Sequence, residues 1–593
     1  MIADFQPSYR LSDNMFRQAK IIIQRSGAAR LIDSYQAPGS DRPHTQRGVN
    51  YTIEAVLICA LSLIILGRTP SYKAILNTLA DLSARQLAEV GMAGQDLSRL
   101  FGPRKDQDRE YHRFERWLTR RLSPLDSQPD QPARRISNAA HRAIVNSRTP
   151  QQQRDYAQTA ERLRIVMNKI VAGSIRDPQP EEACGDIVAD ETIFDLAGPS
   201  SGLGAKDHLK RGACYFGAYY ARDDNAKGPF SEDAKGTGKR GFGVGVTVAV
   251  RVGPPHKLHS VAPVIVGMDI HAPTSGSPEA LGTCIEHMKA NGLDTRATGK
   301  DTYPRVTVDM GYNPKREWVP FLIKHGYSPV VRYPKHWTLT EASTNPPGSS
   351  ATAPPGPIQF AGSFYCPAAE QLLRGHTVPK TRELLTSGRW AEHDRKLAAV
   401  LPFLMGTNSR PIVNGRPGRP RLGDEPEMNV KAELVCPAVQ MRVRCPLKPA
   451  SMQSAAFGVP LATPTWQADE RTCCRQSTLR VTLTQPQLQK ATWGGPVVTS
   501  WEHALYFEAA RSATEQRFSL LKSPHITNLV QMKSGPRREP MVKILLALAI
   551  AATNHNIQQH YSAPKLREES IDIRMRQLRK SLGYEPTRTP PRT

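Results

Sequence analysis

The sequence predicts a mixed α/β fold (α+β) in which a helical N-terminal region precedes an α/β core that is split by an insertion. Helical periodicity dominates the first 180 residues, and short β-rich runs that alternate with helices begin near Asp186. A Pro/Gly-rich stretch at 345–357 then separates this part from helices near the C-terminus. The predicted units are a helical region at residues 1–180, a core in two parts at 181–335 and 498–560, an insertion at 336–497 and a basic tail at 561–593.

The helical region contains one strongly amphipathic segment at 109–122. Its aromatic and aliphatic residues fall on one helical face, whereas arginines follow the opposite face. These arginines are Arg109, Arg113, Arg116 and Arg120. The basic stripe is either a solvated charged surface or a surface that contacts phosphates, and the pattern alone leaves both interpretations open.

The core is predicted from strands that alternate with helices. Strands are expected at 187–189, 243–252, 261–268, 305–308 and 328–332, and helices at 278–291, 318–325, 501–522 and 540–555. Residues 358–497 show no regular pattern, and the tail beyond Pro564 is expected to be partly disordered.

Charge and composition limit the classes of partner. The chain of 593 residues has 79 Lys and Arg against 54 Asp and Glu, a formal net charge of +25. Such an excess indicates a polyanionic partner, although solubility is the alternative reason for it. The longest apolar run, 55–66, is too short to span a bilayer, so no membrane association is expected. With nine cysteines and no visible signal peptide, we expect a protein of the reducing cytoplasm.

Three acidic residues are candidates for a metal site. Asp190 ends an apolar run in IVADETIFDLAG, Asp309 ends RVTVDMGY, and Glu515 lies within the predicted helix RSATEQRFSLLK. Carboxylates at the ends of neighbouring strands meet at one edge of a sheet, and carboxylates are preferred ligands of Mg²⁺. Each acid taken alone is more often a cap, turn or surface residue. Asp186 and Asp195 are rival first acids.

The helix that carries Glu515 adds two cations to the pattern. Arg511, Glu515 and Lys522 have the spacing R-x3-E-x6-K, which places them on one edge of a helix. An ordinary i,i+4 ion pair between Arg511 and Glu515 is the simpler interpretation.

Together these motifs resemble the insertion-sequence DDE transposases with the YREK signature. The resemblance covers about 185–335 and 498–556, and its most specific part is TEQRFSLLKS. The signature tyrosine would fall at Glu508, so its role is left to Tyr506 or lost. In this family the gap before the glutamate often holds an inserted domain, as 336–497 would.

The resemblance implies an RNase H-like catalytic core and a DNA transposase. Asp190, Asp309 and Glu515 would be the catalytic residues and would hold two Mg²⁺ (or Mn²⁺) ions, while Arg511 and Lys522 contact DNA phosphates. The reactions are cleavage at the transposon ends, which frees a 3′-OH, and attack of that 3′-OH on target DNA. The expected partners are double-stranded DNA, as terminal inverted repeats and target, and a second copy of the chain on paired ends. The protein would associate with the nucleoid.

Two weaker signals lie in the insertion. Cys436, Cys445, Cys473 and Cys474 suggest a structural Zn²⁺ site, but C-x2-C pairs are missing and free thiols are the simpler interpretation. The segment GRPGRPR offers Arg416 and Arg419 to a DNA minor groove, with a basic loop as the alternative.

Two other functions remain open from the sequence. A transposase-derived protein that binds DNA without catalysis would keep the basic surfaces, and an RNase H-like nuclease without strand transfer would keep the acids.

Overall fold

The structure is a computed structural model of the whole chain. The chain is a mixed α+β protein, as predicted. The residues that the structure describes are 11–36, 49–132, 134–198, 206–222, 239–296, 303–312, 317–333, 337, 339–341, 356–374, 376, 384, 387–407, 411–413, 430–453, 458–529, 531–532, 536–561 and 570–591.

Helices make up the N-terminal region. They are α1 (Asp13–Ser26), α2 (Ala28–Ser34), α3 (Ile53–Ile65), α4 (Tyr72–Ala80), α5 (Ala84–Glu89), α6 (Arg104–Leu122), α7 (Asn138–Asn146) and α8 (Pro150–Gly173), with 3-10 turns at Ser98–Phe101 and Ser123–Leu125. Most of them begin at a serine or threonine whose side chain accepts a backbone N–H of the first turn. These N-caps are Ser12, Thr52, Ser71, Ser83, Ser137 and Thr149.

The core is a seven-stranded mixed sheet among the described residues. Its strands are β1 (Ile187–Leu196), β2 (Ala218–Arg222), β3 (Lys239–Arg251), β4 (Ile265–His271), β5 (Arg305–Thr307), β6 (Ser328–Val330) and β14 (Gln531–Met532). β3 pairs antiparallel with β1, β2 and β4, whereas β1, β5 and β6 run parallel to one another. The first three long strands therefore form an antiparallel meander, to which two parallel strands are added on the β1 side.

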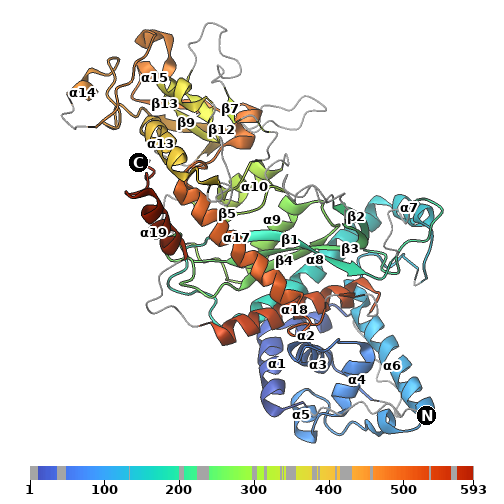
Figure 1. The fold of residues 1–593 in the computed structure, drawn as a ribbon. Helices are drawn as coiled ribbons and strands as arrows, with labels where there is room; N and C mark the ends of the chain where they lie inside the picture. Colours follow the sequence, from blue (N-terminus) through green and yellow to red (C-terminus); the bar gives the residue numbers. More distant parts are fainter. Residues whose placement is uncertain are drawn as a thin grey trace.

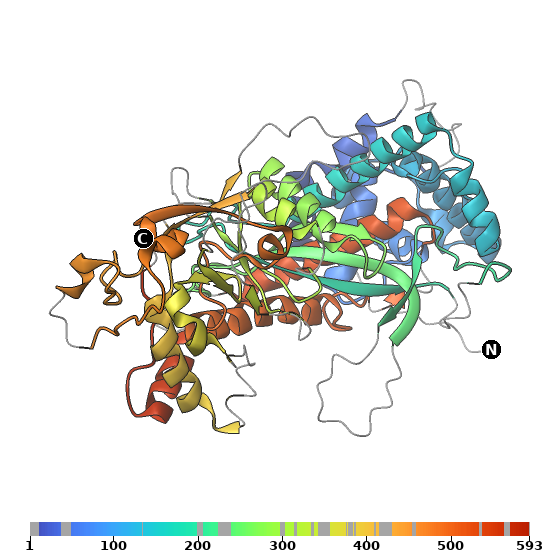
Figure 2. The same cartoon turned by 90° about the horizontal axis from the view of Figure 1, so that it is seen from above.

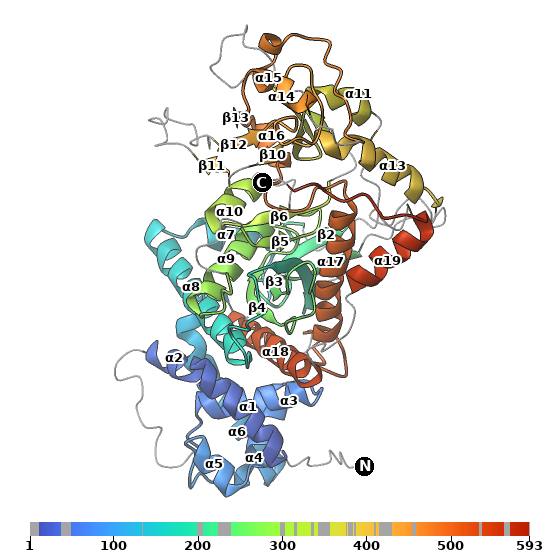
Figure 3. The same ribbon diagram turned by 90° about the vertical axis from the view of Figure 1, so that its left-hand side faces the viewer.

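Helices cover both faces of this sheet. α9 (Ser277–Ala290) and α10 (Trp318–His325) lie on one side, and α17 (Trp501–Leu521) lies on the other, as Figure 3 shows. In Figure 1, α17 runs across the sheet beside β5 and β1. Side chains of successive β1 residues alternate between these faces, as expected for a strand: Ile187 and Ala189 join the core with α9, and Val188 joins the core with α17.

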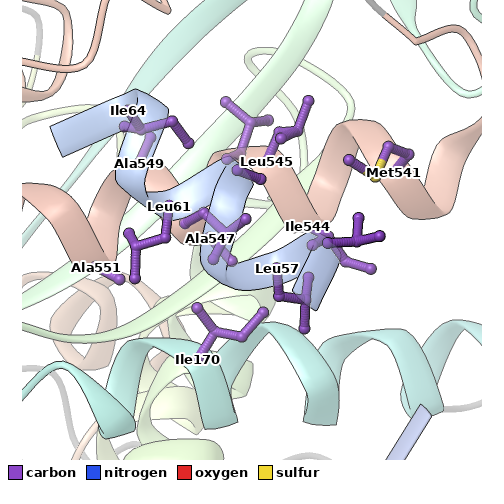
Figure 4. Packing of buried hydrophobic residues seen from close by; sticks show 14 of the residues in the cluster. Leu57, Leu61, Ile64, Ile170, Met541, Ile544, Leu545, Ala547, Ala549 and Ala551 are labelled. Atoms are coloured by element: carbon purple, nitrogen blue, oxygen red, sulfur yellow. The ribbon is translucent and has the colours of Figure 1, made fainter. Parts of the chain in front are cut away.

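The helical region and the sheet share one hydrophobic core. α18 (Glu539–His560) joins them, because it packs against α3 and α8 as well as beside the sheet. Figure 4 shows Leu57 and Leu61 of α3 against Ile544 and Leu545 of α18. α18 is long and apolar enough to cross a membrane by length and composition, but 89% of its apolar window is buried inside the protein. It therefore has the surroundings of a core helix.

The insertion is more regular than the sequence indicates. Its strands are β7 (Thr340–Glu341), β8 (Ile358–Phe360), β9 (Ser363–Tyr365), β10 (Gly406–Thr407), β11 (Ile412–Val413), β12 (Val430–Val435) and β13 (Thr478–Thr482), in a three-stranded and a four-stranded sheet. Its helices are α11 (Glu370–Leu373), α13 (Trp390–Val400), α14 (Pro449–Met452), α15 (Thr472–Arg475) and α16 (Gln485–Lys490), with 3-10 turns at Pro367–Ala369, Leu401–Phe403 and Ala468–Glu470. Strands of two to six residues carry too short a pattern to be recognised in the sequence. The insertion lies at the opposite end of the sheet from the N-terminal helices (Figure 2).

One further prediction is wrong. β1 does not end at Asp190 but continues to Leu196, because β3 pairs with it from Ile187 to Asp195 and keeps its polar residues extended. The tail contains a helix, α19 (Ser570–Leu582), which packs beside α17 because Met575 and Leu578 are buried in the core of the insertion. The expected linker lies almost entirely outside the described residues.

Candidate active site

Two aspartates lie level with each other on neighbouring strands. β1 and β5 are parallel, with Val188 opposite Thr307. Asp190 and Asp309 each lie two residues further along, so the register places them side by side at the end of β5. The backbone N–H of Gly311 donates to Oδ1 of Asp309 (2.8 Å), and that of Glu191 donates to Oδ1 of Asp190 (2.8 Å). Both carboxylates are thereby oriented by their own chain.

Helix α17 brings a third carboxylate and a cation to this pair. Val188 packs against α17, and Asp190 points to the same face of the sheet because side chains two residues apart share a face. Arg511 and Glu515 lie one helical turn apart on α17 and are joined by a 3.2 Å ion pair from Nε to Oε1.

The guanidinium of Arg511 is the hub of the cluster. One terminal nitrogen lies 3.7 Å from Oδ2 of Asp190, and the other lies 3.9 Å from Oδ2 of Asp309. Each nitrogen of Arg511 therefore faces a different carboxylate, with Nε on Glu515. Three carboxylates and one guanidinium leave a formal charge of −2, which a divalent cation would neutralise.

Exposure rises across the cluster. The side chain of Asp190 is 15% exposed, that of Asp309 33% and that of Glu515 61%. Burial and the neighbouring charge of Asp309 raise the pKa of Asp190 to about 7, even though Arg511 opposes the shift. Asp190 is therefore the most buried carboxylate of the three, while Glu515 faces open solvent.

An open groove begins at Glu515. Its volume is about 550 Å³, and Thr192, Glu515, Phe518 and Lys522 are among its lining residues. Lys522 ends α17 and its Nζ donates to the carbonyl oxygen of Ile193 on β1 (2.8 Å), with Nζ also 5.3 Å from the centre of the Phe194 ring. The structure thus places Lys522 and Glu515 on one groove, separated by two turns of helix.

The donor set suits a hard divalent cation, although the side chains are not arranged around one. Carboxylate oxygens are the ligands that Mg²⁺ prefers. Among the described residues, no group of three or more His, Cys, Asp or Glu side chains stands in a ligating arrangement. At this cluster the Arg511 guanidinium lies where the carboxylates converge, so a cation shared by all three would displace it.

The rival acids of β1 have structural roles. Asp186 is 1% exposed and accepts hydrogen bonds from the backbone N–H (2.7 Å) and guanidinium (3.2 Å) of Arg305. Asp195 accepts a hydrogen bond from the hydroxyl of Tyr220 (2.6 Å). Neither joins the cluster around Arg511.

The signature tyrosine has no counterpart at the cluster. Tyr506 is 2% exposed and its hydroxyl donates to Asp186 (3.3 Å), which is itself 1% exposed. Glu508, at the signature position, forms ion pairs with Arg332 (2.9 Å) and Arg574 (3.2 Å). It therefore links α17 to β6 and to the tail helix.

A second, basic groove lies between the helical region and the start of α18. It has a volume of about 900 Å³, and five cations and one acid are among its lining residues. They are Lys73, Arg116, Arg120, Arg537, Arg538 and Glu115. Arg116 and Arg120 were predicted as DNA-binding residues. The sequence did not indicate Lys73, Arg537 and Arg538. Lys73 comes from α4 and the two arginines from the segment before α18, so these cations meet the arginines of α6 only in the folded chain.

The remaining predicted residues are placed as follows. Arg113 does not line this groove; its side chain is 25% exposed and lies 3.9 Å from Glu110. Arg416 and Arg419 lie outside the described residues. The four predicted zinc-binding cysteines line one cavity, and Cys366 joins them there. In the sequence, Cys366 shares one feature with Cys436 and Cys445, since each of the three is followed by proline.

Comparisons with protein-family models, with curated proteins and with solved structures found no match to this chain. The function proposed below therefore rests on the residues and geometry described above.

Proposed function

We propose that the protein is a DNA transposase of the DDE type, with an RNase H-like catalytic core that cleaves transposon ends and joins the freed 3′-OH to target DNA. The observation that carries the proposal is the meeting of Asp190, Asp309 and Glu515 around Arg511. Asp190 and Asp309 are 119 positions apart in the chain, and Asp309 and Glu515 are 206 apart, but all three converge on one face of one sheet.

The topology supports the RNase H-like part of the proposal. An RNase H-like sheet has three antiparallel strands followed by two parallel ones, with the first strand in the middle. The order β4-β3-β1-β5-β6, with α9 and α10 as the crossovers, agrees with this arrangement. The first acid then lies on the central strand, the second after the neighbouring strand and the third on the helix that follows the insertion.

Asp190, Asp309 and Glu515 would hold the divalent metal ions. Two such ions supply activation of a nucleophile and stabilisation of the leaving oxygen in phosphodiester chemistry. Arg511 keeps the three carboxylates together before the ions bind, and its charge then becomes available to a phosphate. Lys522 places a second positive charge in the groove that begins at Glu515, where a DNA strand would lie.

The basic groove would contact the phosphates of a DNA duplex. Lys73, Arg116, Arg120, Arg537 and Arg538 provide sequence-independent phosphate contacts. Double-stranded DNA would thus be the partner, at the nucleoid of the cytoplasm, and assembly of two copies on paired ends is part of the proposal.

One observation favours a second function. The Arg511 guanidinium already neutralises part of the carboxylate charge, as in a protein that binds DNA but does not catalyse. Such a transposase-derived protein would keep its affinity for terminal repeats and lack cleavage.

A plasmid excision assay with Mg²⁺, using the DNA that flanks the gene as substrate, tests the proposal. Wild type should release and join the ends, while Asp309→Asn and Glu515→Gln should bind DNA without cutting. Glu508→Gln is the matched control on the same helix, since Glu508 pairs with Arg332 away from the cluster, and it should keep cutting. Binding without cleavage by wild type would favour the DNA-binding protein, and cleavage without joining would favour a nuclease.

A further inference from the structure

Five of the nine cysteines meet at one small cavity in the insertion. Cys366 follows β9, Cys436 follows β12, and Cys445 lies in the next loop, whereas Cys473 and Cys474 lie on α15. The cavity has a volume of about 20 Å³, enough for one water-sized occupant or a single ion. Four separate stretches of chain thus bring sulfur atoms to a space of the size of one ion.

The backbone of each loop cysteine is held in place by a hydrogen bond. The N–H of Cys366 donates to the carbonyl of Phe403 (2.9 Å), and that of Cys436 to the carbonyl of Ser477 (3.0 Å). The N–H of Cys445 donates to Oγ of Ser451 (2.9 Å). Only the side-chain torsions of these residues are free to adjust around the cavity.

Backbone amides also point at the sulfur atoms. Cys366 and Cys445 are each followed by proline, and the chain then turns so that N–H groups face the thiol. The N–H of Ala368 faces Cys366, and those of Leu447 and Lys448 face Cys445. Burial raises the pKa of Cys366 to about 12 and that of Cys445 above its usual value, and these N–H groups oppose the shift.

The surroundings of Cys474 distinguish it from its neighbour. Nε1 of Trp466 donates to its sulfur (3.4 Å), and Lys448 and Arg471 lie close enough to favour its negative charge. Cys473 instead donates its thiol hydrogen to Cys474 and packs in the core with α9 rather than in that of Cys436 and Cys445. No acidic residue is among those lining the cavity, and Lys448 is its one charged lining residue.

We propose that Cys366, Cys436, Cys445 and Cys474 bind one structural zinc ion in this cavity. Four thiolates with no water-accessible position form a closed tetrahedral site, and soft sulfur ligands select zinc over Mg²⁺. The thiols do not stand in a ligating arrangement among the described residues, so binding requires rotation about the side-chain torsions, which have three staggered positions.

The ion would join the two sheets of the insertion. Cys366 follows the three-stranded sheet, while Cys436 and Cys474 flank β12 and β13 of the four-stranded sheet. Because ligands from distant positions in the chain come together only on folding, the free energy of zinc binding would stabilise the folded insertion. This inference is independent of the proposed transposase activity.

Metal analysis of the full-length protein, purified under reducing conditions without chelators, tests the proposal. We expect about one zinc per chain, and exchange for Co²⁺ should give the absorption of a tetrahedral thiolate site. Cys474→Ser should abolish this absorption. Cys473→Ser, one residue away, and Cys284→Ser, buried in another core, should retain it.

Three results would overturn the proposal. They are a folded wild type that binds neither zinc nor Co²⁺, zinc retained in Cys474→Ser, and a disulfide between cavity cysteines in protein kept reduced. If the serine variants fail to fold, titration of wild type with a thiol-specific mercurial decides, since zinc should be released only as the cavity thiols react. If the zinc is lost in Asp309→Asn and retained in the cysteine variants, the ion belongs to the carboxylate cluster.

Discussion

Replacing Asp309 by asparagine should make the stability of the metal-free protein fall less as the pH rises from 5 to 8. The pKa of Asp190 rises from 3.8 to about 7, through burial first and the charge of Asp309 second. Such a shift corresponds to roughly 4 kcal/mol at 1.36 kcal/mol per unit, so the smaller share due to Asp309 is about 1 to 2 kcal/mol. Asparagine keeps Oδ1 as acceptor for the N–H of Gly311 and removes the charge, and with it the ion pair to Arg511 at every pH.

The sign of the pH dependence follows from proton binding. Between pH 4 and 7 the folded protein holds a proton on Asp190 that the unfolded chain has released, so stability falls as pH rises through this range. Asp309→Asn lowers the pKa of Asp190 in the folded protein. The free energy gained by removing the repulsion between Asp309 and Asp190 is complete at pH 8, and it is absent near pH 5, where Asp190 is protonated in both proteins.

Thermal unfolding in EDTA at pH 5 and pH 8 measures this effect. The midpoint of Asp309→Asn relative to that of wild type should be about 1 to 3 °C higher at pH 8 than at pH 5, since the loss of the ion pair with Arg511 affects both pH values alike. Glu515→Gln is the control, since Glu515 contributes least to the shift, and its midpoint should move less. Mg²⁺ should then raise the midpoint of wild type but not of Asp309→Asn. A midpoint difference between variant and wild type that is the same at both pH values, or lower at pH 8, would refute the reasoning.

Three further predictions concern the groove, the core and the rival acid. Arg116→Ala with Arg120→Ala should weaken DNA binding and reduce the slope of log K against log salt by about 0.9 for each phosphate that is no longer neutralised, as filter binding at several salt concentrations would measure. Leu545→Ala should cost about 2 to 5 kcal/mol, seen as a lower unfolding midpoint, because Leu545 is 1% exposed where α18 meets α3. Asp186→Asn should cost about 3 to 5 kcal/mol in the same assay, because it leaves the charge of Arg305 unpaired in a buried site.

Each of these has a result that would contradict it. Arg85→Ala is the control for DNA binding, because Arg85 forms an exposed ion pair with Asp13. If Arg85→Ala weakens DNA binding as much as the Arg116→Ala, Arg120→Ala variant does, the groove is not the DNA-binding site. An unchanged midpoint in Leu545→Ala would contradict the shared core. A folded Asp186→Asn that binds DNA but does not cleave it would make Asp186 the first catalytic acid.

Local patterns in the sequence predicted much of the core. The strands at β3, β5 and β6 and the helices α9, α10, α17 and α18 carry runs long enough, or bounded clearly enough, to be recognised. Asp309 follows such a strand directly. Asp190 was recognised from the residues before it, although β1 continues, because its extension depends on pairing with β3 rather than on its own composition.

Other features depend on contacts between distant residues. Arg537 and Arg538 have no local pattern, and they become part of a groove only because α18 packs against the helical region. The position of Arg511 among three carboxylates follows from the register of β1 and β5. Spacing alone suggested an isolated i,i+4 pair, whereas the fold adds Asp190 and Asp309 as partners.

The central claim is that Asp190, Asp309 and Glu515 form the centre that joins DNA. Its most direct test offers purified protein a labelled, pre-cleaved end of the flanking DNA with a free 3′-OH, together with a target plasmid and Mg²⁺. The account predicts that wild type and Glu508→Gln join the end to the plasmid and that Asp309→Asn does not. Joining by Asp309→Asn at the wild-type rate, or no joining by wild type that binds both DNAs, would contradict it.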